Sequence, residues 1–134
     1  MQKILVALAF ALIAMPLPAQ QPTAPAEEKK IEMTRYYVVF LRRGPAWTAE
    51  RSPEVQAIGK GHMDNIKRLA DLGKLVIAGP FLEQSGERAL AGLFIFRVES
   101  ADEAKALTET DPAVKAGRFV YEIVPWLGPK TLSY

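Results

Sequence analysis

The chain has 134 residues, of which 49% are hydrophobic and 24% are charged, and its formal net charge is +2. This length suits one ordinary domain, and this balance is typical of a folded protein with a substantial core. The weak, dispersed positive charge argues against nucleic acid as a partner. The chain has no cysteine and a single histidine, His62. It therefore lacks the thiolate ligands of zinc and of iron–sulfur clusters, and a metal site would need carboxylates beside His62. Because no suitably spaced acidic cluster surrounds His62, we expect no metal and no cofactor.

Residues 1–19 predict a signal peptide, because Lys3 precedes an apolar run from Ile4 to Met15 that prolines and Ala19 follow. This run is shorter than the roughly 20 apolar residues of a membrane-spanning helix. We expect cleavage after Ala19, a periplasmic or secreted location, and no stable membrane anchor after cleavage. An uncleaved anchor is the alternative. Residues 20–33 are rich in Gln, Pro, Ala, Glu and Lys and predict a flexible tether.

The rest of the chain alternates strand and helix patterns. Ser52 and Ser100 are typical helix caps, and Glu103 completes a capping box with Ser100. The order βαββαβ predicts an α+β, ferredoxin-like domain over residues 34–128, with a four-stranded antiparallel sheet, both helices on one face, and a tail over 129–134. The expected strands are 36–41, 74–82, 89–98 and 118–126, and the expected helices are 53–72 and 101–110.

Two of these strands, 36–41 and 89–98, are apolar on both faces, since aromatic and aliphatic residues fill successive positions. Two helices can cover only one face of the sheet. We therefore expect the second face to be covered by another copy of the chain, which makes a homodimer.

His62 lies on the inward stripe of the first helix, with Ile58 and Ile66. It is either a core residue with satisfied ring nitrogens or a general base that needs a carboxylate partner. The topology brings Asp111 to the same end of the domain, so Asp111 is the leading partner and Asp64, on another face of the helix, the weaker one. Asp111 could instead serve only as the N-cap before Pro112.

Other candidate residues lie at the same end of the predicted sheet. Arg42 and Arg43 follow the first strand and could hold an anionic small molecule, although such arginines are commonly only solvated. Gly79, Pro80 and Phe81 end the second strand and could line a binding site, with packing at the rim as the alternative.

Three segments resemble the YCII-related family: Gly61-His62-Met63, the run from Gly73 to Pro80 that ends in Ala-Gly-Pro, and Thr110 to Gly117 with its Asp-Pro. The resemblance covers residues 36–126 and implies a dimeric α/β barrel related in fold to muconolactone isomerase. It also implies that His62 and Asp111 form a catalytic dyad. One characterised branch of the family resembles a dehydrochlorinase of hydroxylated, chlorinated aromatic rings. The signal peptide and the tether depart from a typical cytoplasmic member.

Two hypotheses of different class follow. The first is a small cofactor-independent enzyme, a lyase, isomerase or hydrolase, that acts on a small polar or aromatic molecule with His62 as base and Asp111 as its orienting partner. The second is a non-catalytic dimeric module that binds a small molecule or serves in a stress response. A haem-degrading monooxygenase is a third option, for which His62 would be the only available axial ligand.

Export is testable by mass spectrometry of the protein isolated from its native host. We expect a mature N-terminus at Gln20, because the apolar run and its flanks match a cleavable signal. An intact Met1 in a soluble cytosolic fraction would contradict this prediction.

Overall fold

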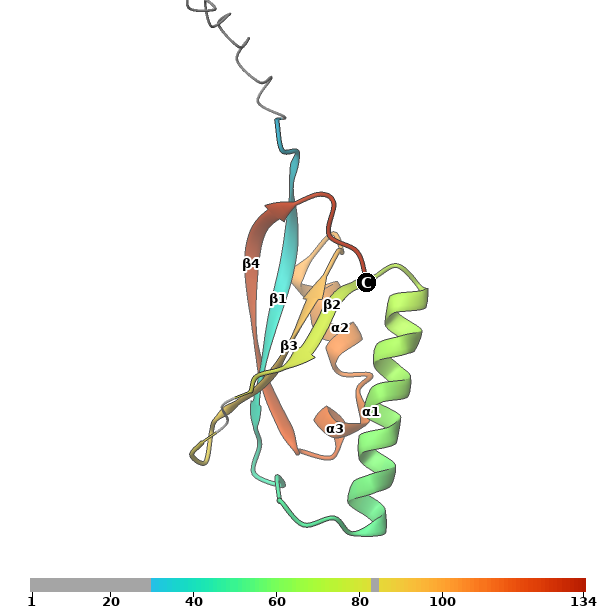
Figure 1. Ribbon diagram of the computed structural model, residues 1–134, viewed down its shortest axis with the longest axis vertical. Helices are drawn as coiled ribbons and strands as arrows, with labels where there is room; N and C mark the ends of the chain where they lie inside the picture. The colour runs from blue at the N-terminus through green and yellow to red at the C-terminus, as the bar shows by residue number, and fades with distance from the viewer. Residues whose placement is uncertain (1–29, 83–84) are drawn as a thin grey trace, which may run out of the picture.

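The computed structural model describes residues 30–82 and 85–134 (Figure 1). The predicted signal peptide and most of the predicted tether lie outside these residues. The described elements, in chain order, are β1 (Met33–Arg43), α1 (Pro53–Asp71), β2 (Leu75–Pro80), β3 (Leu90–Phe96), α2 (Ala101–Thr108), α3 (Pro112–Lys115) and β4 (Phe119–Pro129).

The four strands form one antiparallel sheet in the order β2-β3-β1-β4, with the helices on one of its faces (Figure 1). This is the α+β, ferredoxin-like arrangement that the sequence predicts, and that prediction is confirmed. The order places the first and third strands in the centre of the sheet, which explains why both are apolar on each face.

The helix boundaries follow from local sequence. Ser52 caps α1 by accepting a hydrogen bond from the Val55 amide, and Ser100 caps α2 by accepting one from the Glu103 amide. The helix α1 ends at Asp71, after which Gly73 takes a left-handed backbone with φ of 69°. The helix α2 ends at Thr108, two residues earlier than predicted, and the Asp-Pro pair that follows starts the separate short helix α3.

The main core lies between the sheet and the helices. It joins buried side chains of the strands to those of the helices, among them Val39, Ile66, Leu69, Phe94 and Phe96. The inward stripe of α1 is therefore placed as the apolar spacing predicts, and it carries His62 toward the sheet.

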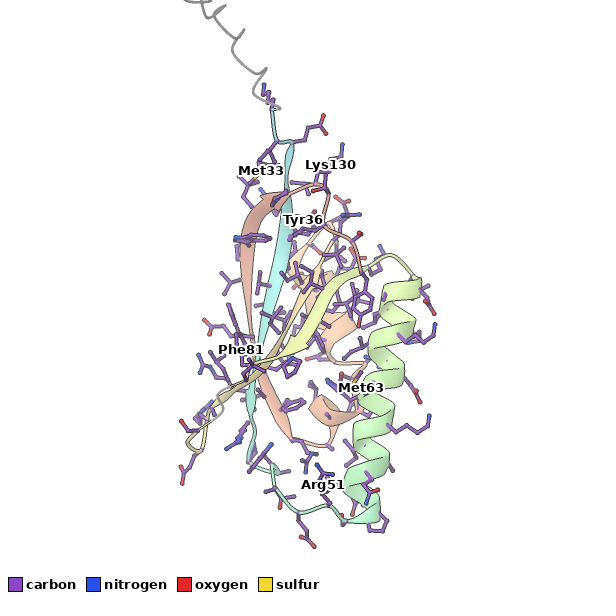
Figure 2. The ribbon with its side chains drawn as sticks, viewed as in Figure 1. Met33, Tyr36, Arg51, Met63, Phe81 and Lys130 are labelled. Carbon is purple, nitrogen blue, oxygen red and sulfur yellow. The ribbon has the colours of Figure 1, made fainter. Side chains whose placement is uncertain are left out.

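The helix-free face of the sheet is partly covered by the chain's own C-terminal residues. Tyr36 is fully buried, its hydroxyl donates to the Pro129 carbonyl at 2.7 Å, and Leu132 packs on the same cluster. Figure 2 shows Tyr36 close to Lys130, where the chain turns back after β4. The Arg97 guanidinium holds this turn by donating to the carbonyls of Lys130 and Leu132.

The strands β1 and β4 are longer than the sequence pattern indicates, whereas β2 and β3 are shorter. The strand β1 pairs with β4 along its whole length, from Met33 opposite Pro129 to Arg43 opposite Phe119. The fold therefore reaches one residue beyond the predicted domain boundary at each end. Within the described residues, no helix is long and apolar enough to span a bilayer.

The homodimer stays a prediction. Because the C-terminal residues cover part of the helix-free face, the area left for a second copy is smaller than the sequence analysis assumes. On the helix-free face, Val124 and Trp126 of β4 remain 37% and 40% exposed. We expect light scattering on the chain without residues 1–19, at micromolar concentration, to give twice the chain mass. We expect Val124→Glu to give a monomer, since burying an unpaired carboxylate costs several kcal/mol.

The matched control is Met63→Glu on α1, which alters another exposed apolar side chain and should leave the mass unchanged. A monomeric parent chain would refute the dimer.

Candidate active site

The structure brings His62 and Asp111 together, although they are 49 residues apart in sequence. The imidazole Nδ1 lies 2.7 Å from Asp111 Oδ2, within normal hydrogen-bond distance. The Asp111 side chain is fully buried, whereas the His62 side chain is 19% exposed. The pair is thus a buried carboxylate joined to a ring that solvent or a ligand can still reach.

The second carboxylate oxygen of Asp111 caps the short helix α3. Asp111 Oδ1 accepts a hydrogen bond from the Ala113 amide at 2.8 Å, and Pro112 occupies the first turn. The capping role and the pairing with His62, which the sequence presents as alternatives, therefore coexist on one side chain. Because the cap fixes Oδ1, it also fixes the direction of Oδ2.

The imidazole is enclosed by two aromatic rings that the sequence analysis did not assign to the site. Phe94 of β3 stacks on it with 5.9 Å between centroids, and Phe119 of β4 meets it edge-on at 5.5 Å. The alternation of side chains along the strands was the sequence signal that could have identified these two rings. His62 faces the sheet, so it contacts the strand side chains that point toward α1.

The tautomer of His62 follows from these contacts. A buried carboxylate accepts, so Nδ1 donates its proton to Asp111 and we assign the Nδ1–H form. Within the part of the chain that the structure describes, Nε2 makes no hydrogen bond. In the Nδ1–H form, its lone pair is therefore free to accept a hydrogen bond.

Asp64, the weaker candidate partner, does not contact the imidazole. Its carboxylate forms an exposed ion pair with Lys60, one helical turn earlier, at 2.5 Å. This matches the expectation that a residue two positions from His62 faces another direction on the helix.

Arg42 and Arg43 end β1 at the same end of the sheet, and Arg43 lines a hollow there. The Arg43 guanidinium stacks over the Trp47 ring at 3.7 Å and donates to the Gly86 carbonyl, while Arg42 donates to the Arg88 carbonyl. Neither His62 nor Asp111 is among the described residues that line this hollow, which are Arg43, Gly44, Pro45, Trp47, Gly86, Glu87, Arg88 and Val120.

Gly79, Pro80 and Phe81 form the end of β2 and the start of the hairpin to β3. Gly79 and Pro80 pair with Leu93 and Gly92, next to the Phe94 that stacks on His62. Figure 2 shows Phe81 where this hairpin leaves the sheet. Among the described residues, these three make no recorded bond or ring contact with His62 or Asp111, and their role in binding stays a prediction.

A charged network ties the connection between α2 and α3 to the sheet. The Glu109 carboxylate accepts from Lys105 at 2.6 Å and from the Tyr121 hydroxyl at 2.7 Å, and these two bonds, in that order, lower the pKa of Glu109. Burial and then the bond to Glu109 raise the pKa of Tyr121. The segment that leads to Asp111 is thus bonded to strand β4 through Tyr121.

The described residues include no group of three or more His, Asp or Glu side chains placed to hold a metal ion. The donor set beside His62 consists of one carboxylate, and that carboxylate is already engaged by the Ala113 amide and the imidazole.

The family model of the YCII-related domain matches residues 36–127, which is most of the chain. The chain belongs to the YCII-related domain family. The resemblance that the sequence motifs indicate is thereby confirmed. Comparison with curated proteins finds no match.

One solved structure similar to this YCII-related protein is a 5-chloro-2-hydroxyhydroquinone dehydrochlorinase from Burkholderia phenoliruptrix, in complex with 2,5-dihydroxybenzoquinone. The two share 22% sequence identity with a TM-score of 0.46, over 68% of this chain and 92% of the other.

The tautomer assignment gives a prediction for this YCII-related chain. In Asp111→Asn, we expect the amide oxygen to keep the Ala113 amide, which leaves the NH₂ group facing Nδ1. Nδ1 must then accept, and the neutral ring changes to the Nε2–H form. Nitrogen-15 NMR of the single histidine reports this change directly.

Asp64→Asn is the matched control and should leave the ring in the Nδ1–H form, because Asp64 pairs with Lys60. A parent protein whose neutral ring is in the Nε2–H form would contradict the assignment.

Proposed function

We propose that this YCII-related protein is a cofactor-independent enzyme that moves a proton on a small polar or aromatic molecule, in a lyase, isomerase or hydrolase reaction. The observation that carries the proposal is the 2.7 Å contact between the His62 imidazole and the fully buried Asp111 carboxylate. An oriented imidazole with one free nitrogen is the arrangement that general base catalysis requires.

In this proposal Nε2 of His62 removes a proton from a carbon or oxygen atom of the substrate. The electron pair left behind forms a new double bond or attacks an electrophilic centre in the substrate. Asp111 stabilises the imidazolium that results, through the Nδ1–H bond that already exists. The ring then returns the proton to another substrate atom or to the leaving group, which restores the neutral form.

The surroundings of the ring favour a flat or partly apolar substrate. Phe94 and Phe119 flank the imidazole and limit the water that can compete for Nε2. Aromatic side chains also offer stacking contacts to a ring-shaped molecule. Small hydroxylated aromatics and lactones are therefore the substrates to test first.

Arg42 and Arg43 have a supporting role in the proposal, as groups that hold an anionic part of the substrate. Arg43 stacks on Trp47, so the two side chains together offer a cation and an aromatic surface. Gly79, Pro80 and Phe81 complete the expected binding surface on the β2 side. We also propose that the enzyme acts outside the cytoplasm, after removal of residues 1–19.

A second function is favoured by a separate observation. The hollow beside Arg43 and Trp47 is lined without either member of the dyad, among the described residues. A non-catalytic dimeric module could bind an anionic small molecule there, with His62 and Asp111 acting only as structural residues.

Turnover separates these two functions. We expect the parent chain to convert at least one member of a panel of hydroxylated aromatics and lactones, and His62→Gln to lower kcat by roughly 10²- to 10⁴-fold, as for loss of a general base. The substitution keeps a polar side chain of similar size. Asp64→Asn, on the same helix, should retain the parent rate.

Ligand binding without turnover, unchanged in His62→Gln, would favour the binding module. Equal turnover in the parent and in His62→Gln would remove His62 from the chemistry.

A further inference from the structure

Three consecutive residues where α2 connects to α3 contact residues that are spread along α1. Thr110 contacts Asn65 and Arg68, Asp111 contacts His62, and Pro112 packs against Gly61. The short helix α3 consequently lies against α1 (Figure 1). The dyad is thus the middle one of three contacts along the same helix.

The contact on one side of the dyad is a polar cluster. Asn65 is only 8% exposed, and its Oδ1 accepts from Arg68 at 2.7 Å. Asn65 Oδ1 also lies 3.2 Å from Thr110 Oγ1, but the single hydroxyl proton of Thr110 has a closer acceptor in the Leu107 carbonyl at 2.6 Å. Arg68 also contacts Thr110 Oγ1 at 3.0 Å. These bonds join α1 to the residue immediately before Asp111.

Burying the Asn65 amide at this position lowers the stability of the fold. Its Nδ2 is buried and has no hydrogen-bond partner in the described part of the chain. A buried donor without a partner is destabilising, whereas an apolar side chain of the same shape would avoid that cost. Packing alone therefore does not account for Asn65, whereas its bond to Arg68, which in turn donates to Thr110, does.

The contact on the other side of the dyad requires a glycine. A Cβ atom at Gly61 would lie 3.0 Å from Pro112 Cγ and 3.3 Å from Pro112 Cβ, which is too close without a shift of the neighbour. A Cβ atom at Gly59 would meet nothing within 4 Å. Gly61 therefore lets the connection approach α1 closely, and the other glycine of this helix does not share that task.

We propose that Gly61 and the Arg68 guanidinium, which Asn65 holds and which donates to Thr110, are positioning elements that set the distance and direction of Asp111 Oδ2 from His62, and so select the Nδ1–H tautomer. This inference rests on the proposed function, because it assigns the neighbours of the dyad a part in the same chemistry. Among the described residues, Asp111 is the charged side chain that contacts the His62 imidazole. Phe94 and Phe119 are the aromatic side chains that pack against the same imidazole.

The first test compares Gly61→Ala with Gly59→Ala in the full chain. Both changes favour the helix, and for Gly59→Ala we expect the thermal midpoint to rise by roughly 4 °C. In Gly61→Ala the added methyl group displaces Pro112 by a few tenths of an ångström, and Asp111 with it. Nitrogen-15 NMR should then show loss of the pure Nδ1–H signature in Gly61→Ala and no change in Gly59→Ala.

The second test removes and restores the Thr110 hydroxyl. Thr110→Val keeps the shape of the side chain but loses the bond from Arg68 and the bond to the Leu107 carbonyl, whereas Thr110→Ser keeps the hydroxyl that makes both. We expect a shift toward the Nε2–H form in the valine variant and the parent spectrum in the serine variant. A residue with only a structural role would alter the thermal midpoint without altering the tautomer.

Asp111→Asn distinguishes failure of this inference from failure of the proposed function. If Asp111→Asn changes the tautomer but Gly61→Ala and Thr110→Val leave it as in the parent chain, the positioning role is wrong and the dyad stands. If Asp111→Asn also leaves the tautomer unchanged, the dyad itself is refuted, and the positioning role with it.

Discussion

The buried carboxylate of Asp111 is the constraint on which this end of the domain depends. A carboxylate without access to water must be stabilised by donors, and here one oxygen takes the Ala113 amide and the other takes the His62 imidazole. The first bond starts α3 and the second joins α3 to α1. The start of α3 and the candidate chemistry therefore depend on two oxygens of the same side chain.

Much of the fold follows from local patterns. The central strands are recognisable because β1 and β3 are apolar at successive positions, and the helix starts are recognisable from Ser52 and Ser100. The order of elements then leaves one simple antiparallel arrangement, and that arrangement places His62 and Asp111 at a common end. The pairing of these two residues could thus be anticipated from topology, although the sequence offered no way to see that Asp111 would also cap α3 while making it.

What the sequence could not supply is information carried by contacts between distant segments. The choice of Phe94 and Phe119 as the rings around His62 depends on which face of β3 and β4 meets α1, and alternation alone leaves two possibilities. The burial of Tyr36 depends on a C-terminal turn that Arg97 holds through backbone carbonyls, which no side-chain pattern encodes. The burial of a polar residue such as Asn65 cannot be predicted for the same reason, since nothing in the sequence distinguishes a buried asparagine from an exposed one.

Topology accounts for the end of the sheet at which the dyad and the hollow beside Arg43 and Trp47 lie, but not for the direction of their side chains. Both lie at the end of the sheet where β1 ends and β4 begins, because Arg43 pairs with Phe119 in register and Phe119 touches His62. A single strand pair thus links the cation to the imidazole through one aromatic ring. Yet Arg43 turns toward Trp47 and the β2–β3 hairpin, while Phe119 turns toward α1. In the proposed function, a substrate that used both groups would therefore have to extend past the Phe119 ring, with its anionic part near Arg43 and the atom that loses the proton near His62.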